Sequence, residues 1–254
     1  MWNGDYQFLL RNLIVKDFKI RYRNMSLGVF WSLINPLIMM GVLAFVFARI
    51  FRADSIPHYA LYILCGILPF NFLTMAWVSG TSSLLDNAGL IKRVPVPREI
   101  VPIASVLSNC LHLLIQIGLL LTFVVLFGVG VNVEWFWLPF LWGLAIMLVC
   151  GMSLITSGLN IYMRDTRYVV ESVNTVLFWL IPVFYPLSMV PAQYRNIYMY
   201  NPVAVLVEAL RYVLLKAEAP PANMVLRLTV FSFGALIVGL VSFNRLKARF
   251  YDYL

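Results

Sequence analysis

Charged side chains are scarce in this sequence and absent from long parts of it. Asp, Glu, Lys and Arg make up 12% of the 254 residues, against about 25% in a usual soluble domain. Six stretches contain none of them: 24–48, 55–85, 100–133, 135–163, 172–194 and 228–244. Each stretch is long enough to cross the bilayer as a helix, which takes about 17 to 25 residues. The sequence therefore predicts an all-α integral membrane protein with six transmembrane helices, and it excludes a soluble enzyme.

Residues that build catalytic or metal sites are also few. There are two histidines, His58 and His112, and no spacing suits a zinc site, which usually needs three protein ligands. We expect no metal and no catalytic residue, and we interpret His112 as a neutral, hydrogen-bonded packing residue whose further role stays open. The cysteines Cys65, Cys110 and Cys150 lie in apolar stretches, so they do not form a disulfide framework.

No Gly-Lys pair occurs anywhere in the chain. A P-loop needs Gly-Lys followed by Ser or Thr to hold nucleotide phosphates, so we expect no cofactor in this chain and no ATP hydrolysis by it. The net charge of +8 is attributed to anionic lipid or an acidic partner at the membrane surface rather than to nucleic acid.

Lys and Arg are unevenly divided between alternate loops. Segments 1–23, 86–99, 164–171 and 245–249 carry thirteen of them, and the intervening loops, including Arg49 and Arg52, carry six. By the positive-inside rule, both termini and Lys92 should be cytoplasmic, with Asn132 and Gln193 outside.

The segment 5–23 differs from the six apolar stretches. Leu10, Leu13, Ile14 and Phe18 share one helical face, and basic residues occupy the rest. This pattern predicts an amphipathic helix in the membrane interface. A basic flank that only fixes the topology is the alternative.

The region 182–216 is apolar but broken by prolines. Asn201-Pro202 predicts a helix start, with Asn as the cap and Pro at the first position. The helix that follows is about 20 Å long at 1.5 Å per residue, too short to span. We interpret 182–216 as a re-entrant outer gate containing Asn201, Pro202, Glu208 and Arg211, in which Glu208 and Arg211 can pair. An ordinary surface loop, with purely structural pairing, is the alternative.

The loop 90–99 joins the second and third stretches, and its two prolines prevent a continuous helix. Its basic residues and the apolar Ile91, Val94 and Val96 suggest a bent element whose apolar face enters a groove on another protein. A positively charged turn that only fixes topology is the alternative. The residues expected to act in coupling are Ile91, Lys92, Arg93, Val94, Pro95, Pro97, Arg98 and Glu99.

Three ordered motifs carry a family resemblance. The Lys92–Glu99 loop, Arg21-Tyr22-Arg23 with the following Trp31 and Asn35-Pro36, and Pro182–Pro186 with Asn201-Pro202 resemble the ABC-2-type exporter permeases that handle O-antigen, capsular or teichoic-acid polysaccharides. The resemblance covers nearly the whole chain, which we take as a single domain, 1–254. It implies a homodimer in the inner (cytoplasmic) membrane that binds two ATP-binding-cassette subunits, which hold ATP and Mg²⁺, and moves a lipid-linked glycan.

Aromatic residues make up 15% of the chain, and aromatic rings suit the C–H faces of sugars. Candidates for a glycan path are Trp31, Phe72, Trp77, Trp179, Phe184 and Tyr185. For each of them, ordinary packing or lipid contact is the alternative.

Other functions were weighed against glycan export. One is a permease of the same superfamily for a drug, haem or a small lipid, against which the 92–99 loop argues. Another is a membrane-embedded glycan or acyl transferase, which would need acidic and histidine clusters. A structural scaffold would leave the broken region 182–216 unexplained.

Overall fold

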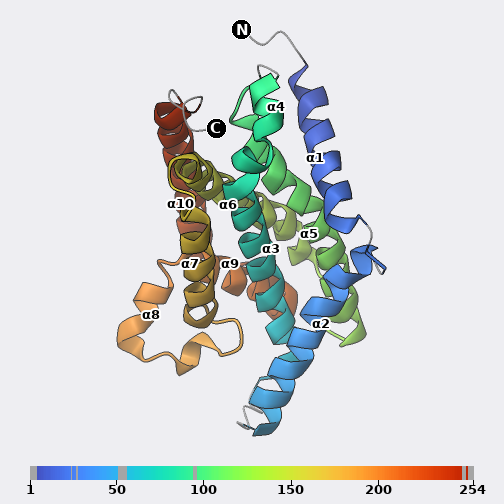
Figure 1. Ribbon diagram of the computed structural model, residues 1–254. Coiled ribbons are helices and arrows are strands. Elements are labelled where there is room, and N and C mark those ends of the chain that lie inside the picture. Colours follow the sequence, from blue (N-terminus) through green and yellow to red (C-terminus); the bar gives the residue numbers. More distant parts are fainter. Residues whose placement is uncertain are drawn as a thin grey trace.

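The computed structural model describes residues 5–23, 25–26, 28–50, 56–93, 96–247 and 250. These residues form a bundle of helices and loops, and no strand occurs among them (Figure 1). The all-α class predicted from the sequence is thus confirmed. The α-helices are α1 (Tyr6–Tyr22), α2 (Trp31–Ala44), α3 (Tyr59–Asp86), α4 (Ala88–Arg93), α5 (Ile100–Leu126), α6 (Trp137–Tyr162), α7 (Thr166–Leu180), α8 (Ala192–Tyr198), α9 (Pro202–Arg211) and α10 (Ala222–Leu246). Shorter helical turns are η1 (Gly28–Phe30), η2 (Phe45–Ile50), η3 (Val133–Phe136), η4 (Leu187–Met189) and η5 (Tyr212–Lys216).

Five helical segments of the described chain are long and apolar enough to cross a membrane. They are Gly28–Phe47, Tyr59–Arg93, Ile100–Leu126, Val133–Tyr162 and Ala222–Leu246, and they match five of the six predicted stretches.

The sixth predicted stretch, 172–194, is only partly helical. Helix α7 ends at Leu180, and no helix resumes before Leu187. Pro182 explains the end, because the residue before a proline is driven from helical to extended backbone, and Ile181 is extended with ψ of 141°. At 1.5 Å per residue, the 15 residues of α7 measure about 22 Å, short of a full crossing.

Helices α6 and α10 run side by side in the same direction. Gly151 faces Ala235, Gly158 faces Leu246 further along, and the Tyr162 hydroxyl donates to the Leu246 carbonyl at 2.7 Å. The segment between them must therefore lead back from the end of α6 to the start of α10. Helix α7 begins this return (Figure 1).

The contact between α6 and α10 is backbone to backbone. A Cβ atom added at Gly151 would lie within 3.0 Å of the Ala235 carbonyl carbon and oxygen, and one at Gly239 would be as close to Gly151. Small residues that let membrane helices approach closely are a common basis for their packing, because lipid removes the hydrophobic drive to associate.

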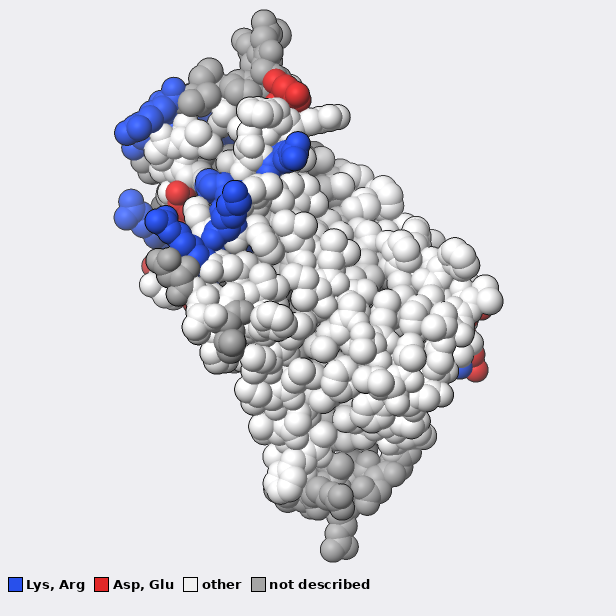
Figure 2. All heavy atoms as spheres, turned by 90° about the vertical axis from the view of Figure 1, so that its right-hand side faces the viewer, with Lys and Arg blue, Asp and Glu red and all other residues white. Residues whose placement is uncertain are grey.

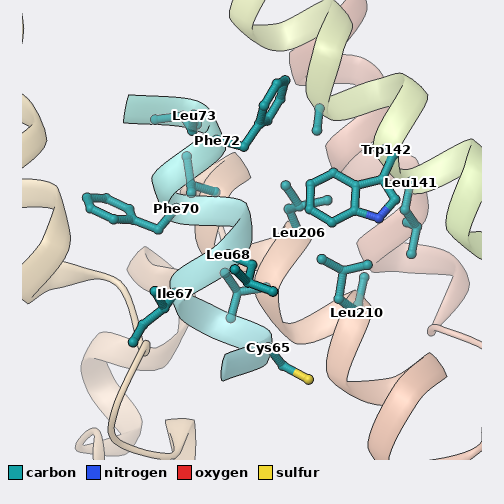
Figure 3. Packing of buried hydrophobic residues seen from close by; sticks show 14 of the residues in the cluster. Cys65, Ile67, Leu68, Phe70, Phe72, Leu73, Leu141, Trp142, Leu206 and Leu210 are labelled. Carbon is teal, nitrogen blue, oxygen red and sulfur yellow. The ribbon is translucent and has the colours of Figure 1, made fainter. Parts of the chain in front are cut away.

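The centre of the bundle is built around α3. Phe72 of α3 packs edge-on against Trp142 of α6, with ring centroids 6.2 Å apart, and Leu206 and Leu210 of α9 lie beside them (Figure 3). Phe72 is only 1% exposed. Phe72 is therefore a packing residue in the core of this bundle, and its place on a glycan path stays a prediction.

Helix α9 is buried along nearly its whole length. Every residue from Val203 to Arg211 is buried except Glu208, which is half-buried. A short apolar helix that does not span is thus enclosed by protein, as its sequence predicted.

Helix α1 has one side against the bundle, while Phe8, Val15 and Ile20 are exposed, and its role as an amphipathic interface helix stays a prediction. Asp5 caps it by accepting a hydrogen bond from the Gln7 N–H at 2.8 Å, and Leu13 on its apolar face is buried. Leu10 and Ile14 pack against the same core cluster.

Lys and Arg gather at one end of the face shown in Figure 2, and a broad uncharged surface extends away from that end. The start of α1, helix α4 and the end of α10 lie at that end of the bundle (Figure 1). Arg52 and Arg249, which entered the charge comparison, lie outside the described residues.

Candidate functional site

Arg211, the last residue of α9, is enclosed at 2% exposure. Its Nη1 donates to the Glu208 carboxylate and the Tyr62 hydroxyl, both at 2.7 Å, and to the Pro182 carbonyl at 2.6 Å. Its Nη2 donates to the Val183 carbonyl at 2.7 Å. The guanidinium carbon also lies 3.5 Å from the centroid of the Tyr62 ring. This group, which we call the Arg211 cluster, ties α9 to α3 and to the non-helical segment after α7.

Gly66 of α3 makes room for the Arg211 cluster. A Cβ atom there would meet the Val183 backbone at 3.0 Å and the Arg211 Nη2 atom at 3.1 Å. The predicted pairing of Glu208 with Arg211 is confirmed, but the two carbonyl partners were missed. The sequence did contain a signal for them. A proline break leaves backbone carbonyls without their helical donors, and within a membrane these carbonyls need other donors. The arginine side chain has five N–H donors.

The predicted start of α9 is also confirmed. Asn201 is the cap, its side chain accepting from the Val203 N–H at 3.0 Å, and Pro202 is the first helical residue. A gating role for this region stays a prediction.

The predicted aromatic path is only partly consistent with the structure. Phe184 is buried, with its ring centroid 4.8 Å from that of Phe47 and 5.1 Å from that of Tyr185, and its place on a glycan path stays a prediction. Tyr185 is half-buried and its hydroxyl donates to the Trp179 carbonyl at 3.1 Å. Trp77 is half-buried, and its Nε1 donates to Thr156 at 3.3 Å.

A groove runs along α3 beside α7 and the end of α1. It consists of two cavities of about 300 and 420 Å³ that share Thr74, Val78 and Glu171. The first is completed by Phe70, Asn174, Thr175, Phe178 and Trp179, and the second by Arg21, Met75, Ser79, Ser82, Asp86 and Arg167. We call it the α3 groove. Its lining combines hydroxyls, an amide, charged side chains of both signs and aromatic rings, a mixture suited to a polar ligand with apolar faces.

Asn174 is the most unusual residue of the α3 groove. It is 3% exposed, and neither its Nδ2 nor its Oδ1 has a hydrogen-bond partner among the described residues. Burying an unpaired amide is costly, so this side chain is suited to bind water or a ligand. Asn174 was not among the predicted site residues, although an Asn within a charge-free stretch was a usable signal.

Where α1 leads into α2, a chain of hydrogen bonds surrounds His112. Its Nδ1 lies 2.6 Å from the Tyr22 hydroxyl, and its Nε2 lies 3.0 Å from the Gln116 amide nitrogen. Because that amide nitrogen is a donor, His112 Nε2 accepts and Nδ1 carries the proton, as in a neutral imidazole. The prediction of a hydrogen-bonded packing histidine is confirmed.

Arg21 and Tyr22 end α1 beside this chain. Burial lowers the pKa of the Arg21 guanidinium, against the opposing influence of Tyr22 and Asp17. Burial also raises the pKa of the Tyr22 hydroxyl, which the Arg21 charge partly offsets. Burial thus favours the neutral form of the Tyr22 hydroxyl and opposes the charged form of Arg21.

The predicted coupling loop differs from expectation in its apolar face. Ile91 and Val96 are buried in the core cluster that contains Leu13, so neither is available to enter a groove on a partner. Val94 and Pro95 lie outside the described residues. Lys92 and Arg93, at the end of α4, are exposed, so these basic side chains are free to meet a partner.

The second half of that loop contacts the end of α10. Arg98 Nη1 donates to the Lys247 carbonyl at 2.6 Å, and the Glu99 carboxylate lies 3.9 Å from the Lys247 amine. The Arg98 guanidinium also lies over the Phe250 ring at 5.7 Å. Pro97, which precedes Arg98 in the chain, is half-buried. Arg98 and Glu99 thus join the loop to α10.

Comparison with known proteins identifies the family. The model of the family described as ABC-2 type transporter matches residues 9–215 of this chain. The chain belongs to this family. It is 30% identical to an O-antigen export system permease protein RfbA of Klebsiella pneumoniae over all of this chain and 98% of that protein. It is 24% identical to the RfbA protein of Myxococcus xanthus, over 90% of this chain and 88% of that protein.

A polysialic acid transport protein is also similar to this chain. The polysialic acid transport protein KpsM of Escherichia coli is 24% identical over 91% of both chains. The family assignment, the all-α fold and the five long apolar segments together make this ABC-2 chain a multi-pass membrane protein of the transport-permease type.

Proposed function

We propose that this chain is the membrane subunit of an ATP-driven exporter that moves a lipid-linked polysaccharide outward across the inner membrane. The end-to-end similarity to an O-antigen export permease carries the proposal, since it covers all of this chain and nearly all of that protein. The α3 groove supports it, because hydroxyls, an amide and the rings of Phe178 and Trp179 line it. For a drug or a small lipid, we would expect a cavity with a more uniformly apolar lining.

The proposed assembly is a homodimer with two cytoplasmic ATP-binding-cassette subunits. The absence of any Gly-Lys pair in the sequence supports an external ATPase, which would hold ATP and Mg²⁺. A transferase is less well supported, because the described residues contain no group of three or more His, Cys, Asp or Glu side chains close enough to hold a metal.

The function is tested in liposomes that contain the purified chain with its ATPase partner. We expect no ATP hydrolysis by the chain alone, and ATP-dependent movement of lipid-linked polysaccharide by the complex. A partner whose P-loop lysine is replaced is the control and should move none. ATP hydrolysis by the pure chain would contradict the proposal. So would ATP hydrolysis by the complex that haem or a small lipid stimulates and the polysaccharide does not.

We further propose six crossings, with both termini cytoplasmic. The parallel course of α6 and α10 supports a sixth crossing, since 163–221 must return between them, with α7 as its helical part. The clustering of Lys and Arg at the end that holds α4 (Figure 2) supports the orientation. Cysteine labelling should reach position 92 only from the cytoplasm and position 193 only from outside, and the reverse pattern would refute the orientation.

The exposed Lys92 and Arg93 are proposed to dock on the ATPase, while Arg98 and Glu99 pass its movement to α10. Replacing both cations (Lys92→Gln with Arg93→Gln) should weaken binding of the ATPase about tenfold at low salt. The difference should shrink in about 1 M salt, where the Debye length falls to about 3 Å. Binding can be measured by surface plasmon resonance with the chain in nanodiscs.

The matched control replaces two exposed cations of α1 (Arg11→Gln with Lys19→Gln), which removes the same amount of positive charge from a different helix. Equal losses in the two double variants would mean that net charge, rather than a docking contact at α4, governs the association.

A further inference from the structure

A third cavity lies in the angle between α1 and α2, with α3 and α5 beside it. Its volume is about 460 Å³, and Trp31, Ser32, Asn35, Asn71, Met75 and Gln116 are among the residues that line it. It adjoins the α3 groove, with which it shares Arg21 and Met75. We call it the elbow pocket.

Three amide side chains of the elbow pocket have unused hydrogen-bonding capacity. Asn35 and Asn71 make no side-chain hydrogen bond with any described residue. The Oε1 atom of Gln116, which is 1% exposed, is buried and likewise has no partner in the described chain. The buried Gln116 Oε1 is unfavourable unless something in the cavity bonds to it. Asn35, which is exposed, and Asn71, which is half-buried, have amides available to bond a ligand beside it.

The rest of the pocket is neutral and partly aromatic. The indole of Trp31 is 45% exposed and offers a flat apolar face beside Asn35. His112 is engaged by Tyr22 and Gln116, and the one cation of the lining, Arg21, donates to the Asn109 side chain. That bond uses only Nη1 of Arg21, and all the other side chains of the lining are uncharged amides, hydroxyls, rings or apolar groups. A sugar ring suits the pocket, because its hydroxyls both donate and accept, as amides do, and its C–H face can stack on an indole.

We propose that the elbow pocket binds a sugar unit of the transported glycan through Asn35 and Asn71, with Trp31 against the face of the ring. This rests on the proposed export of a lipid-linked polysaccharide and names the part of the substrate that is recognised. The pocket is accessible, because Met25, Trp31 and Asn35 are exposed at its rim. The amides would thus give the permease a direct contact with the sugar.

The test uses the full-length chain in nanodiscs, with Cys65, Cys110 and Cys150 replaced and Met75→Cys as the reporter. The rate of alkylation by N-ethylmaleimide is measured with increasing lipid-linked polysaccharide extracted from the host cells. We expect at least fivefold protection. Asn35→Ala with Asn71→Ala should raise the half-protecting concentration about tenfold, equivalent to about 1.4 kcal/mol. Asn196→Ala, an exposed amide on α8, is the matched control and should change nothing.

The contrary results are distinguishable. Equal protection by the lipid carrier stripped of its glycan would show that lipid fills the pocket and would overturn the proposal. Absence of protection in a chain whose complex still exports polysaccharide would also overturn it and leave the function intact. If the unaltered complex exports no polysaccharide, the proposed export function is refuted. If the double variant does not fold, Trp31→Ala at the exposed rim replaces it and should raise the half-protecting concentration in the same way. An unchanged half-protecting concentration would refute sugar binding in the elbow pocket.

Discussion

Replacing Arg211 with methionine is expected to destabilise the protein by about 3 to 5 kcal/mol, the usual cost of removing one partner of a buried ion pair. The change leaves Glu208 without its cation, and it leaves the carbonyls of Pro182 and Val183 without the donors seen in the structure. A fall of the melting temperature of roughly 10 °C should follow, measured by scanning fluorimetry of the purified protein.

Two further variants isolate the cause. Lys216→Met removes an exposed cation five residues further along the chain and should shift the melting temperature by less than a few degrees. Arg211→Lys keeps the charge but has fewer donors, so it should recover only part of the loss. Full stability of Arg211→Lys would mean that the charge alone matters and that the carbonyl contacts do not.

Replacing Gly151 with alanine should sharply reduce the amount of folded protein. The added methyl group would overlap the backbone of α10 at Ala235, and a backbone cannot move aside as a flexible side chain can. Overpacking typically costs about 1 to 3 kcal/mol and occasionally more. A cost at the upper end is expected here, because α6 and α10 would have to move apart to make room for the methyl group. Membrane-inserted, monodisperse protein should be quantified by fluorescence-detected size-exclusion chromatography.

Gly143 provides the matched control, since it lies on the same helix and a Cβ atom there meets no atom within 4 Å. Gly143→Ala should leave the yield unchanged or raise it slightly, because alanine favours a helix over glycine by up to about 1 kcal/mol. Similar yields from the two variants would show that the close approach of α6 and α10 is not needed for folding.

Much of the fold follows from the sequence for simple physical reasons. Helical stretches that cross hydrocarbon must exclude charge over a fixed length, so the bounds of α3 at Tyr59 and α5 near Ile100 could be predicted closely. Asn201-Pro202 predicted the start of α9 because capping is a local interaction. The early end of α7 was not predicted, since the apolar composition of 181–190 concealed the effect of Pro182.

The candidate sites were less predictable, because they depend on which side of each helix faces a neighbour. Phe72 and Trp31 are both aromatic residues in apolar stretches, yet one is in the core and the other lines a cavity. Ile91 and Val96 were expected to face a partner and are instead buried within the chain. The unpaired amides of Asn35, Asn71 and Asn174 could be recognised only when the surrounding side chains were in place.

The parallel pairing of α6 and α10 also has a consequence for biosynthesis. Tyr162 and its partner Leu246 are 84 residues apart in the chain, so a ribosome working at about 5 to 20 residues per second needs about 4 to 17 s to make the second after the first. During that interval the side of α6 with Gly151 and Gly158 has no α10 to cover it. The insertion machinery, or a lipid, must cover this side of α6 until the last helix arrives.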